Sequence, residues 1–124
     1  MSSLEIVLLD RGKRLFRSGF LKGHGYEVFA TEHVVEVCLH WSPEVCAALV
    51  IGPDIPWQQV ATLCDWIKIN NPEKPIILLG DRRGLRRPPI DAVVPTQPAS
   101  AMVEQLRALL PVPERAGKAG TPER

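Results

Sequence analysis

The 124-residue sequence has few cysteines and no surplus of charge of either sign. Its three cysteines, Cys38, Cys46 and Cys64, form no C-x-x-C pair and have apolar neighbours. We therefore interpret them as reduced core residues and not as zinc ligands or a redox pair. With 15 Lys and Arg against 14 Asp and Glu, the net charge by itself indicates neither a nucleic-acid binder nor a membrane-surface protein.

Long apolar runs and a basic leader are also missing. No apolar run approaches the roughly 18 residues of a membrane-spanning helix. The first five residues carry an acid and no basic residue ahead of the first apolar run. We therefore expect no signal peptide, no membrane insertion and a cytoplasmic location.

Motifs of catalysis and cofactor binding are absent as well. The sequence has no Gly-rich phosphate loop and no serine elbow. The three histidines, His24, His33 and His40, do not have the spacing of metal ligands. The sequence therefore predicts that the protein is not an enzyme and has no metal and no cofactor.

What the sequence does contain is a regular alternation of apolar strands and helices. It predicts strands over residues 4–9, 26–30, 47–51, 75–79 and 91–94, and helices over residues 13–22, 34–41, 56–70 and 99–110. In the first helix we expect Leu15, Phe16 and Phe20 to share the apolar face. Alternation of this kind implies a parallel sheet with helices on both faces. One domain over residues 1–110 is predicted, followed by a disordered tail or linker stub over residues 111–124, where prolines, glycines and charges prevail.

Five segments occur in an order and at a spacing that are typical of one family. They are residues 6–10, residues 25–28 with a Gly-Tyr pair, residues 48–52 with Pro56 four residues on, residues 75–79, and the pair Gln97 and Pro98. In these segments the chain resembles the receiver domain of bacterial response regulators. The resemblance implies a flavodoxin-like, CheY-like three-layer α/β sandwich whose five-stranded parallel sheet has the order 2-1-3-4-5. The fourth helix is expected to be shortened or absent, because the segment before Gln97 is short and contains Pro88 and Pro89.

The resemblance also implies which positions would carry phosphorylation. Asp10 and Arg11 match the two acids that hold Mg²⁺, and Gly52 matches the aspartate that accepts the phosphoryl group. Gly80 matches a serine or threonine, and Gln97 matches a lysine, both of which contact that group. Only Asp10 keeps the expected chemistry, so we interpret these five positions as a degenerate phosphorylation site. Arg11 is expected to repel Mg²⁺ and to take its place.

Three further side chains belong to this part of the chain. We expect Asp54 to be a solvated loop carboxylate that caps the third helix. Asp10 is expected to bond to Arg11 or to backbone N–H groups at the start of the first helix. Trp57 is predicted either to plug the vacant acceptor position or to face a partner.

Four arginines, Arg82, Arg83, Arg86 and Arg87, crowd into one short segment. Three interpretations stay open: a solvated loop, a contact for an acidic protein surface, or a site for a phosphate-bearing ligand such as a nucleotide or nucleic acid.

Together these features predict a non-phosphorylatable, receiver-like (pseudo-receiver) module in a bacterial two-component or phosphorelay system. Its expected partner is another signalling protein, namely a kinase, an output domain or a regulator, and homodimer formation stays open. The alternative is a small module that binds a nucleotide or nucleic acid through the segment Arg82–Arg87.

Overall fold

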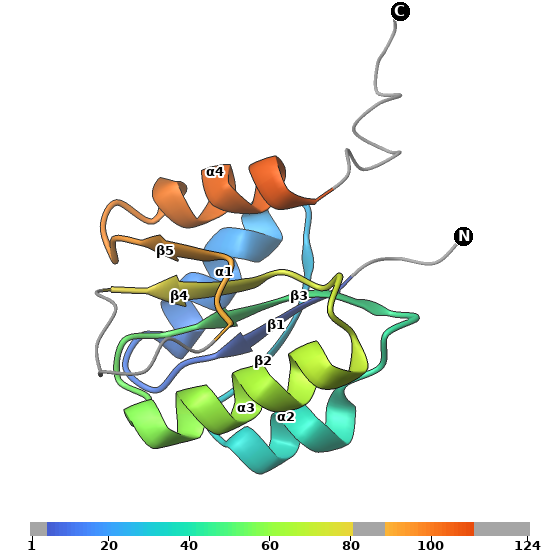
Figure 1. Cartoon of the computed structure of the whole chain (residues 1–124). Helices are drawn as coiled ribbons and strands as arrows, with labels where there is room; N and C mark the ends of the chain where they lie inside the picture. Colours follow the sequence, from blue (N-terminus) through green and yellow to red (C-terminus); the bar gives the residue numbers. More distant parts are fainter. Residues whose placement is uncertain (1–4, 81–88, 111–124) are drawn as a thin grey trace, which may run out of the picture.

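A five-stranded parallel sheet forms the centre of the protein (Figure 1). The computed structural model describes residues 5–80 and 89–110, so the four crowded arginines and the predicted tail lie outside the described residues. The strands are β1 (Glu5–Leu9), β2 (Glu27–Thr31), β3 (Cys46–Ile51), β4 (Ile76–Leu79) and β5 (Ala92–Val94). Their order is β2-β1-β3-β4-β5, and every pair is parallel, which confirms the predicted topology.

Helices cover both faces of this sheet. They are α1 (Arg14–Gly23), α2 (Val34–His40), α3 (Trp57–Asn70) and α4 (Ser100–Leu109). Figure 1 shows α1 and α4 on one face and α2 and α3 on the other. In the described part of the chain, no helix lies between β4 and β5 and no helix is long and apolar enough to cross a membrane.

The sheet separates two hydrophobic cores. Successive side chains of a strand point to opposite faces, so Ile6 and Leu8 pack towards α1 and α4 while Val7 and Leu9 pack towards α2 and α3. All six residues of β3 are buried, as expected of a central parallel strand that is covered on both faces. The predicted apolar stripe of α3 is confirmed, because Val60, Leu63, Cys64 and Ile67 are all buried.

The first helix, however, turns a different side to the sheet from the one predicted. We expected Leu15, Phe16 and Phe20 to share the apolar face. Phe20 does pack, partly buried, against the core, but Leu15 and Phe16 are exposed by 78% and 58%. The residues that α1 buries are Arg17, Ser18 and Leu21. A cation on the buried side of a helix requires a buried partner, and that partner lies at the end of β1.

Candidate functional site

The carboxyl ends of the strands bring the predicted positions together at one edge of the sheet (Figure 1). Leu9 and Ile51 are register partners at the ends of β1 and β3, so the residues that follow them, Asp10 and Gly52, are neighbours. Backbone hydrogen bonds hold both in place, from the Asp10 N–H to the Thr31 carbonyl (3.0 Å) and from the Gly52 N–H to the Leu9 carbonyl (2.7 Å). The sequence thus predicted correctly that these residues meet.

Asp10 forms a buried ion pair with Arg17 of α1. The carboxyl group is fully buried, and its Oδ2 accepts a hydrogen bond of 2.7 Å from the Arg17 guanidinium. The Arg17 side chain is itself only 7% exposed. A buried carboxylate must be paired or neutralised, and α1 supplies the counter-charge. The expectation that Arg11 or backbone N–H groups would bond Asp10 was wrong, since Arg11 is exposed on the surface.

The space beside Gly52 is filled by this carboxyl group. A Cβ atom on Gly52 would lie 2.7 Å from Cγ and 3.1 Å from Cβ of Asp10, which is too close for real side chains. The side chain of Asp10 therefore occupies the volume in which an acceptor side chain would begin. Among the described residues, Asp10 Oδ1 is the buried side-chain oxygen without a hydrogen-bond partner, and it is the atom nearest to that position.

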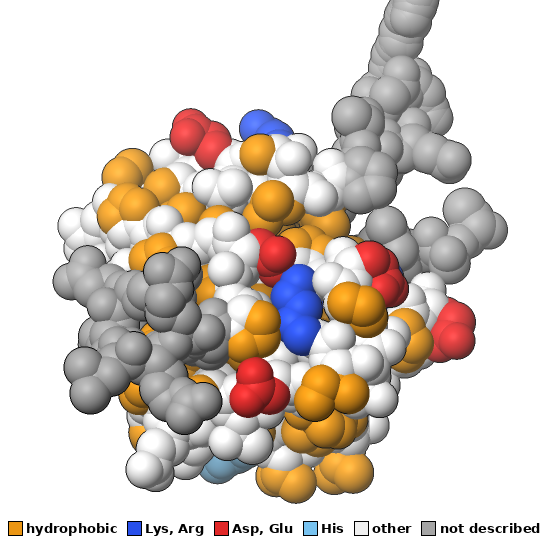
Figure 2. Space-filling view, in the orientation of Figure 1, with side chains coloured by type: hydrophobic (Ala, Val, Ile, Leu, Met, Phe, Trp, Pro, Cys, Tyr) orange, Lys and Arg blue, Asp and Glu red, His pale blue; other side chains and the backbone are white. Residues whose placement is uncertain are grey.

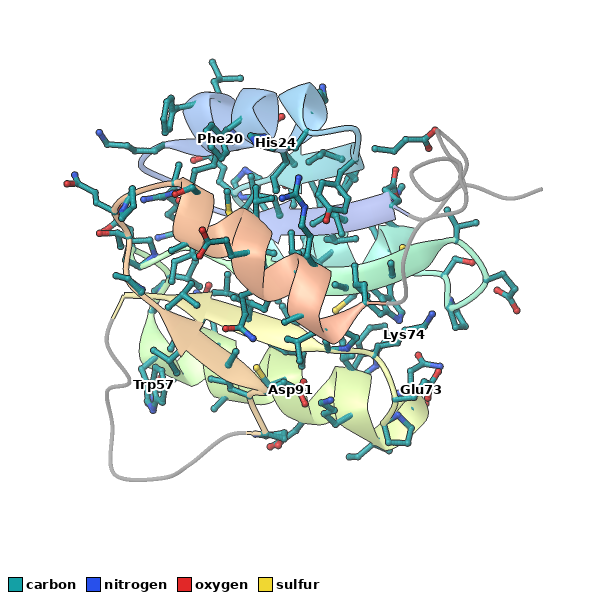
Figure 3. The ribbon with its side chains drawn as sticks, turned by 90° about the horizontal axis from the view of Figure 1, so that it is seen from above. Phe20, His24, Trp57, Glu73, Lys74 and Asp91 are labelled. Atoms are coloured by element: carbon teal, nitrogen blue, oxygen red, sulfur yellow. The ribbon has the colours of Figure 1, made fainter. Side chains whose placement is uncertain are left out.

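Trp57 does not plug the acceptor position, contrary to one of its two predicted roles. It is the first residue of α3 and packs, partly buried, against the core between the sheet and α2 and α3. Figure 3 shows Trp57 on the side of α3, away from Phe20 and His24 at the end of α1, whose tilted rings have centroids 4.6 Å apart.

The residues at this edge do not fit the Mg²⁺ ion that receivers hold. Mg²⁺ binds through carboxylate oxygens in octahedral geometry. Here the guanidinium of Arg17 already neutralises Asp10 at 2.7 Å, and Arg11, the next residue in the chain, offers no carboxylate oxygen. A divalent cation would have to displace the Arg17 guanidinium from Asp10, and Arg11 adds a second positive charge next to Asp10 in the chain.

An open cleft lies next to the ion pair. Its lining includes Lys13, Arg17, Asp54, Thr96 and Gln97. Asp54 is exposed, and its Oδ2 lies 2.5 Å from where a Cβ on Gly12 would stand. The residue that caps α3 is Pro56, not Asp54, and it makes no side-chain cap hydrogen bond, so the predicted capping role of Asp54 is not seen.

Gly80, which follows β4 at the same edge, has a φ of +105°. This conformation is in the left-handed region that favours glycine. A Cβ there would also meet Pro53 at 3.2 Å. The backbone therefore disfavours the serine or threonine of a receiver at this position.

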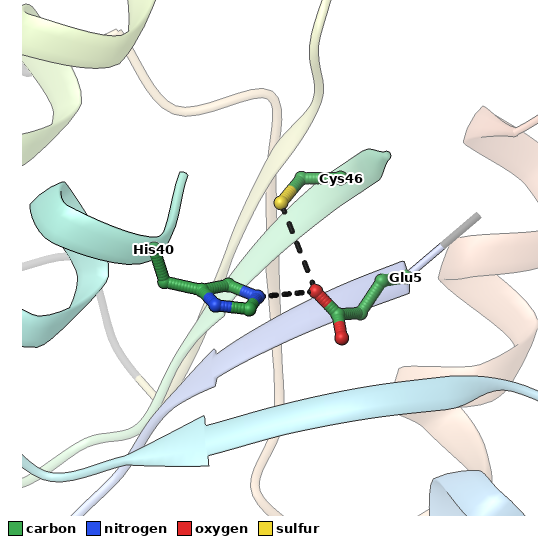
Figure 4. A group of neighbouring side chains, drawn as sticks. All are labelled: Glu5, His40 and Cys46. Carbon is green, nitrogen blue, oxygen red and sulfur yellow. Dashed lines mark hydrogen bonds and ion pairs between the residues drawn. The ribbon is translucent and has the colours of Figure 1, made fainter. Parts of the chain in front are cut away.

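A second polar cluster lies at the opposite, amino end of the sheet (Figure 4). Glu5 opens β1, Cys46 opens β3 and His40 ends α2. Glu5 Oε1 lies 2.5 Å from His40 Nε2 and accepts a long hydrogen bond of 3.9 Å from the Cys46 thiol. Spacing along the chain did not reveal this cluster. The strand order could have revealed it. The parallel strands β1 and β3 begin side by side, and α2, which precedes β3, ends near the same place.

Solved structures with the same fold are response regulators. The response regulator TrrA of Thermotoga maritima, in complex with Mg²⁺ and BeF, is 20% identical, with a TM-score of 0.74 over 89% of this chain and 100% of that chain. In a structure of TrrA with the histidine kinase ThkA, the identity is 18%, the TM-score 0.71, and the coverage 88% of this chain and 99% of that chain. The signal receiver domain of an HD domain-containing protein of Pseudomonas fluorescens is 18% identical, with a TM-score of 0.73 over 89% of this chain and 88% of that chain.

No protein-family model and no curated protein matches the sequence. At these levels of identity the structural likeness shows the fold. The chain therefore has the fold of a response-regulator receiver domain, and the carboxyl edge of its sheet carries the buried Asp10–Arg17 ion pair.

Proposed function

We propose that this protein is a receiver-like signalling module that does not accept a phosphoryl group. It binds another signalling protein through a constant surface and has no catalytic activity of its own. The observation that carries the proposal is the Asp10 carboxyl group, which Arg17 holds in the space beside Gly52. An acceptor and its metal ion would both need that space.

Exposed apolar side chains support a role in protein binding. Leu39 and Ile69, near the ends of α2 and α3, are exposed by 82% and 80%, and Val35 and Trp66 on the same two helices are also exposed. Figure 2 shows hydrophobic side chains gathered at the lower right, where these helices lie in Figure 1. Gatherings of exposed apolar side chains are typical of interaction surfaces.

The proposal is tested first by chemistry at the carboxyl edge. After incubation with acetyl phosphate and Mg²⁺, we expect the intact mass of the full chain to be unchanged. Beryllofluoride with Mg²⁺ should leave the amide NMR shifts of β1, β3 and α1 unchanged. TrrA, which has been solved with Mg²⁺ and BeF, is the positive control. A stable phosphoryl adduct on Asp10 or Asp54 would overturn the proposal.

A second test asks what would restore an acceptor. Gly52→Asp alone should remain unphosphorylated, because the new side chain would meet Asp10, which Arg17 still holds. Phosphorylation is expected only when Arg17→Gln, Arg11→Asp and Gln97→Lys accompany it, since these changes free Asp10 and supply an acid and a cation. Efficient, Mg²⁺-dependent phosphorylation of the single variant would contradict this account.

The proposed partner is a signalling protein such as a histidine kinase. The response regulator TrrA, which has the same fold, has been solved in complex with the kinase ThkA. A constant surface predicts that affinity for such a partner does not depend on phosphoryl donors. Titration calorimetry with histidine kinases of the source organism should give the same dissociation constant with and without acetyl phosphate and Mg²⁺. An affinity that changes on adding the donor would argue against the proposal.

The purified full chain can also be used to test the alternative function, which is binding of a nucleotide or nucleic acid through the segment Arg82–Arg87. A mobility shift with nucleic acid that weakens as salt rises, and is lost when Arg82, Arg83, Arg86 and Arg87 are changed to serine, would favour a basic-loop module. No shift at low salt would exclude nucleic acid as the ligand of these arginines.

A further inference from the structure

The cluster of Glu5, His40 and Cys46 joins three elements at the amino end of the sheet, opposite the edge discussed above (Figure 4). The three potential ligand atoms all lie within 4.8 Å of one another. Glu5 and Cys46 come from adjacent strands, and His40 comes from the last turn of α2. The fold brings the Glu5 carboxylate to the imidazole of His40 and the thiol of Cys46, which lie 35 and 41 residues further along the chain.

The spacing of these atoms is close to that of ligands around one zinc ion. Zinc bonds of about 2.0–2.3 Å in tetrahedral geometry place neighbouring ligand atoms roughly 3.3–3.7 Å apart. In the structure, Sγ of Cys46 lies 3.9 Å and Nε2 of His40 lies 2.5 Å from Oε1 of Glu5. The imidazole and the carboxylate would part by under about 1 Å to admit the ion.

The surroundings hold the three side chains in this arrangement. The His40 ring stacks on Phe29 of β2, with centroids 3.7 Å apart and an interplanar angle of 7°. This stack directs Nε2 towards Glu5. The Cys46 sulfur accepts a hydrogen bond of 3.4 Å from the Ser42 N–H, which fixes the loop before β3. Such supporting contacts keep metal ligands oriented.

We propose that Glu5, His40 and Cys46 form a binding site for one Zn²⁺ ion, with water as the fourth ligand. One thiolate, one carboxylate and one neutral imidazole would exactly offset the two positive charges of the ion. The mixture of sulfur, nitrogen and oxygen suits zinc, which is borderline between hard and soft metals. The side chains of His40 and Glu5 are 33% and 17% exposed, so the ion and its water have a path from solvent.

Binding would release the proton of the Cys46 thiol. Zinc binds the thiolate and not the thiol, so the affinity is expected to increase with pH. Once bound, the ion would clamp β1, β3 and the end of α2 together. The site does not depend on the proposed signalling function, because it shares no residue with the carboxyl edge.

The test titrates the reduced full chain with Zn²⁺ against a chromophoric chelator. We expect saturation at one ion per chain, and Co²⁺ in its place should give the near-ultraviolet band of a thiolate–cobalt bond. Loss of a residue that only supports a metal ligand weakens binding roughly 10–100-fold. His40→Gln and Cys46→Ser each remove a ligand, so each should weaken Zn²⁺ binding by more than that. Cys46→Ser should also abolish the cobalt band.

Matched controls use residues outside the cluster. His24→Gln and Cys38→Ser remove an exposed histidine of the α1 end and a half-buried cysteine of α2, and both should leave the affinity unchanged. Circular dichroism confirms the fold of each variant. If Cys46→Ser fails to fold, the proposal is still tested by the cobalt spectrum of the unaltered chain and by the Zn²⁺ affinity of the His40→Gln variant. No saturable binding, or binding that survives both cluster variants, would overturn the proposal.

Discussion

The two ends of one sheet hold two polar clusters that differ in how far they are closed. At the carboxyl end, Asp10 and Arg17 are buried and leave no room beside Gly52. At the amino end, Glu5 and His40 remain partly exposed next to the buried Cys46. Parallel strands gather polar residues at both ends, but only an accessible cluster can exchange a partner. The carboxyl end of the sheet is therefore the closed one, and the amino end is the accessible one.

The largest expected effect comes from breaking the closed pair. Arg17→Met leaves the fully buried carboxyl group of Asp10 without its partner, so we expect the free energy of unfolding to fall by about 3–5 kcal/mol. The control on the same helix is Arg14→Met. Its pair with Glu32 has side chains 33% and 43% exposed, so the loss should be less than about 1 kcal/mol. Urea unfolding measures both, and equal losses would contradict the comparison.

A double variant separates lost charge pairing from lost packing. Adding Asp10→Asn to Arg17→Met removes the buried charge and should recover part of the stability. If the double variant is no more stable than Arg17→Met, the pair does not act through charge.

A smaller effect is expected from filling the space beside the pair. Gly52→Ala places a methyl group against the Asp10 carboxyl group and should destabilise the protein by about 1–3 kcal/mol. Gly19→Ala is the matched control, since nothing lies within 4 Å of a Cβ at that exposed position of α1. It should instead stabilise by about 0.5–1 kcal/mol, because alanine favours the helix. Thermal unfolding that gives both variants the same sign would refute the expected clash.

The next prediction concerns how the free energy of unfolding depends on pH, through the Cys46 thiol at the amino end of the sheet. Burial raises the pKa of the Cys46 thiol from its ordinary value, so at alkaline pH the native state holds a proton that the unfolded chain has lost. Stability should therefore fall as pH rises through this range, by at most about 1.4 kcal/mol per pH unit for one proton. Cys46→Ala should show a shallower fall in urea unfolding without metal. Equal slopes would indicate that the thiol is not the group responsible.

The smallest effect is expected at the exposed pair itself. In the presence of a chelator, His40→Gln should cost less than about 1 kcal/mol, because the His40 and Glu5 side chains are 33% and 17% exposed. His24→Gln provides the comparison on α1. A loss as large as that of Arg17→Met would mean that the two ends are equally closed.

The sheet and its strand order could be predicted from the sequence, because they follow from apolar runs that alternate with helical stripes. The orientation of α1 could not be predicted in this way. The pattern of Leu15, Phe16 and Phe20 favoured one face, since large apolar side chains usually lie inside. Burial of Asp10 at the end of β1 outweighed that preference, because it requires the counter-charge of Arg17. Such a requirement appears only when strand and helix are placed in space.

In the candidate sites, too, some features could be predicted from the sequence and others could not. Asp10, Gly52 and Gly80 were predicted at one edge because each follows an apolar strand. The ion pair with Arg17 was missed, since a lone arginine in a helix is usually solvated. The amino-end cluster was missed because the sequence analysis considered spacing along the chain. The expected roles of Arg82, Arg83, Arg86 and Arg87 stay predictions, because these residues lie outside the described residues.

The division of the interior by the sheet has a consequence for how this sequence can change. Val50 and Ile51 are consecutive in β3, yet they belong to different cores, on the side of α1 and α4 and on the side of α2 and α3. Volume lost at one of them can be compensated only by residues of the same core. Compensation for a change at Val50 is therefore expected from residues of its own core such as Leu21 and Met102, and compensation for a change at Ile51 from residues such as Val60 and Ile67, all of which lie outside β3 in the sequence.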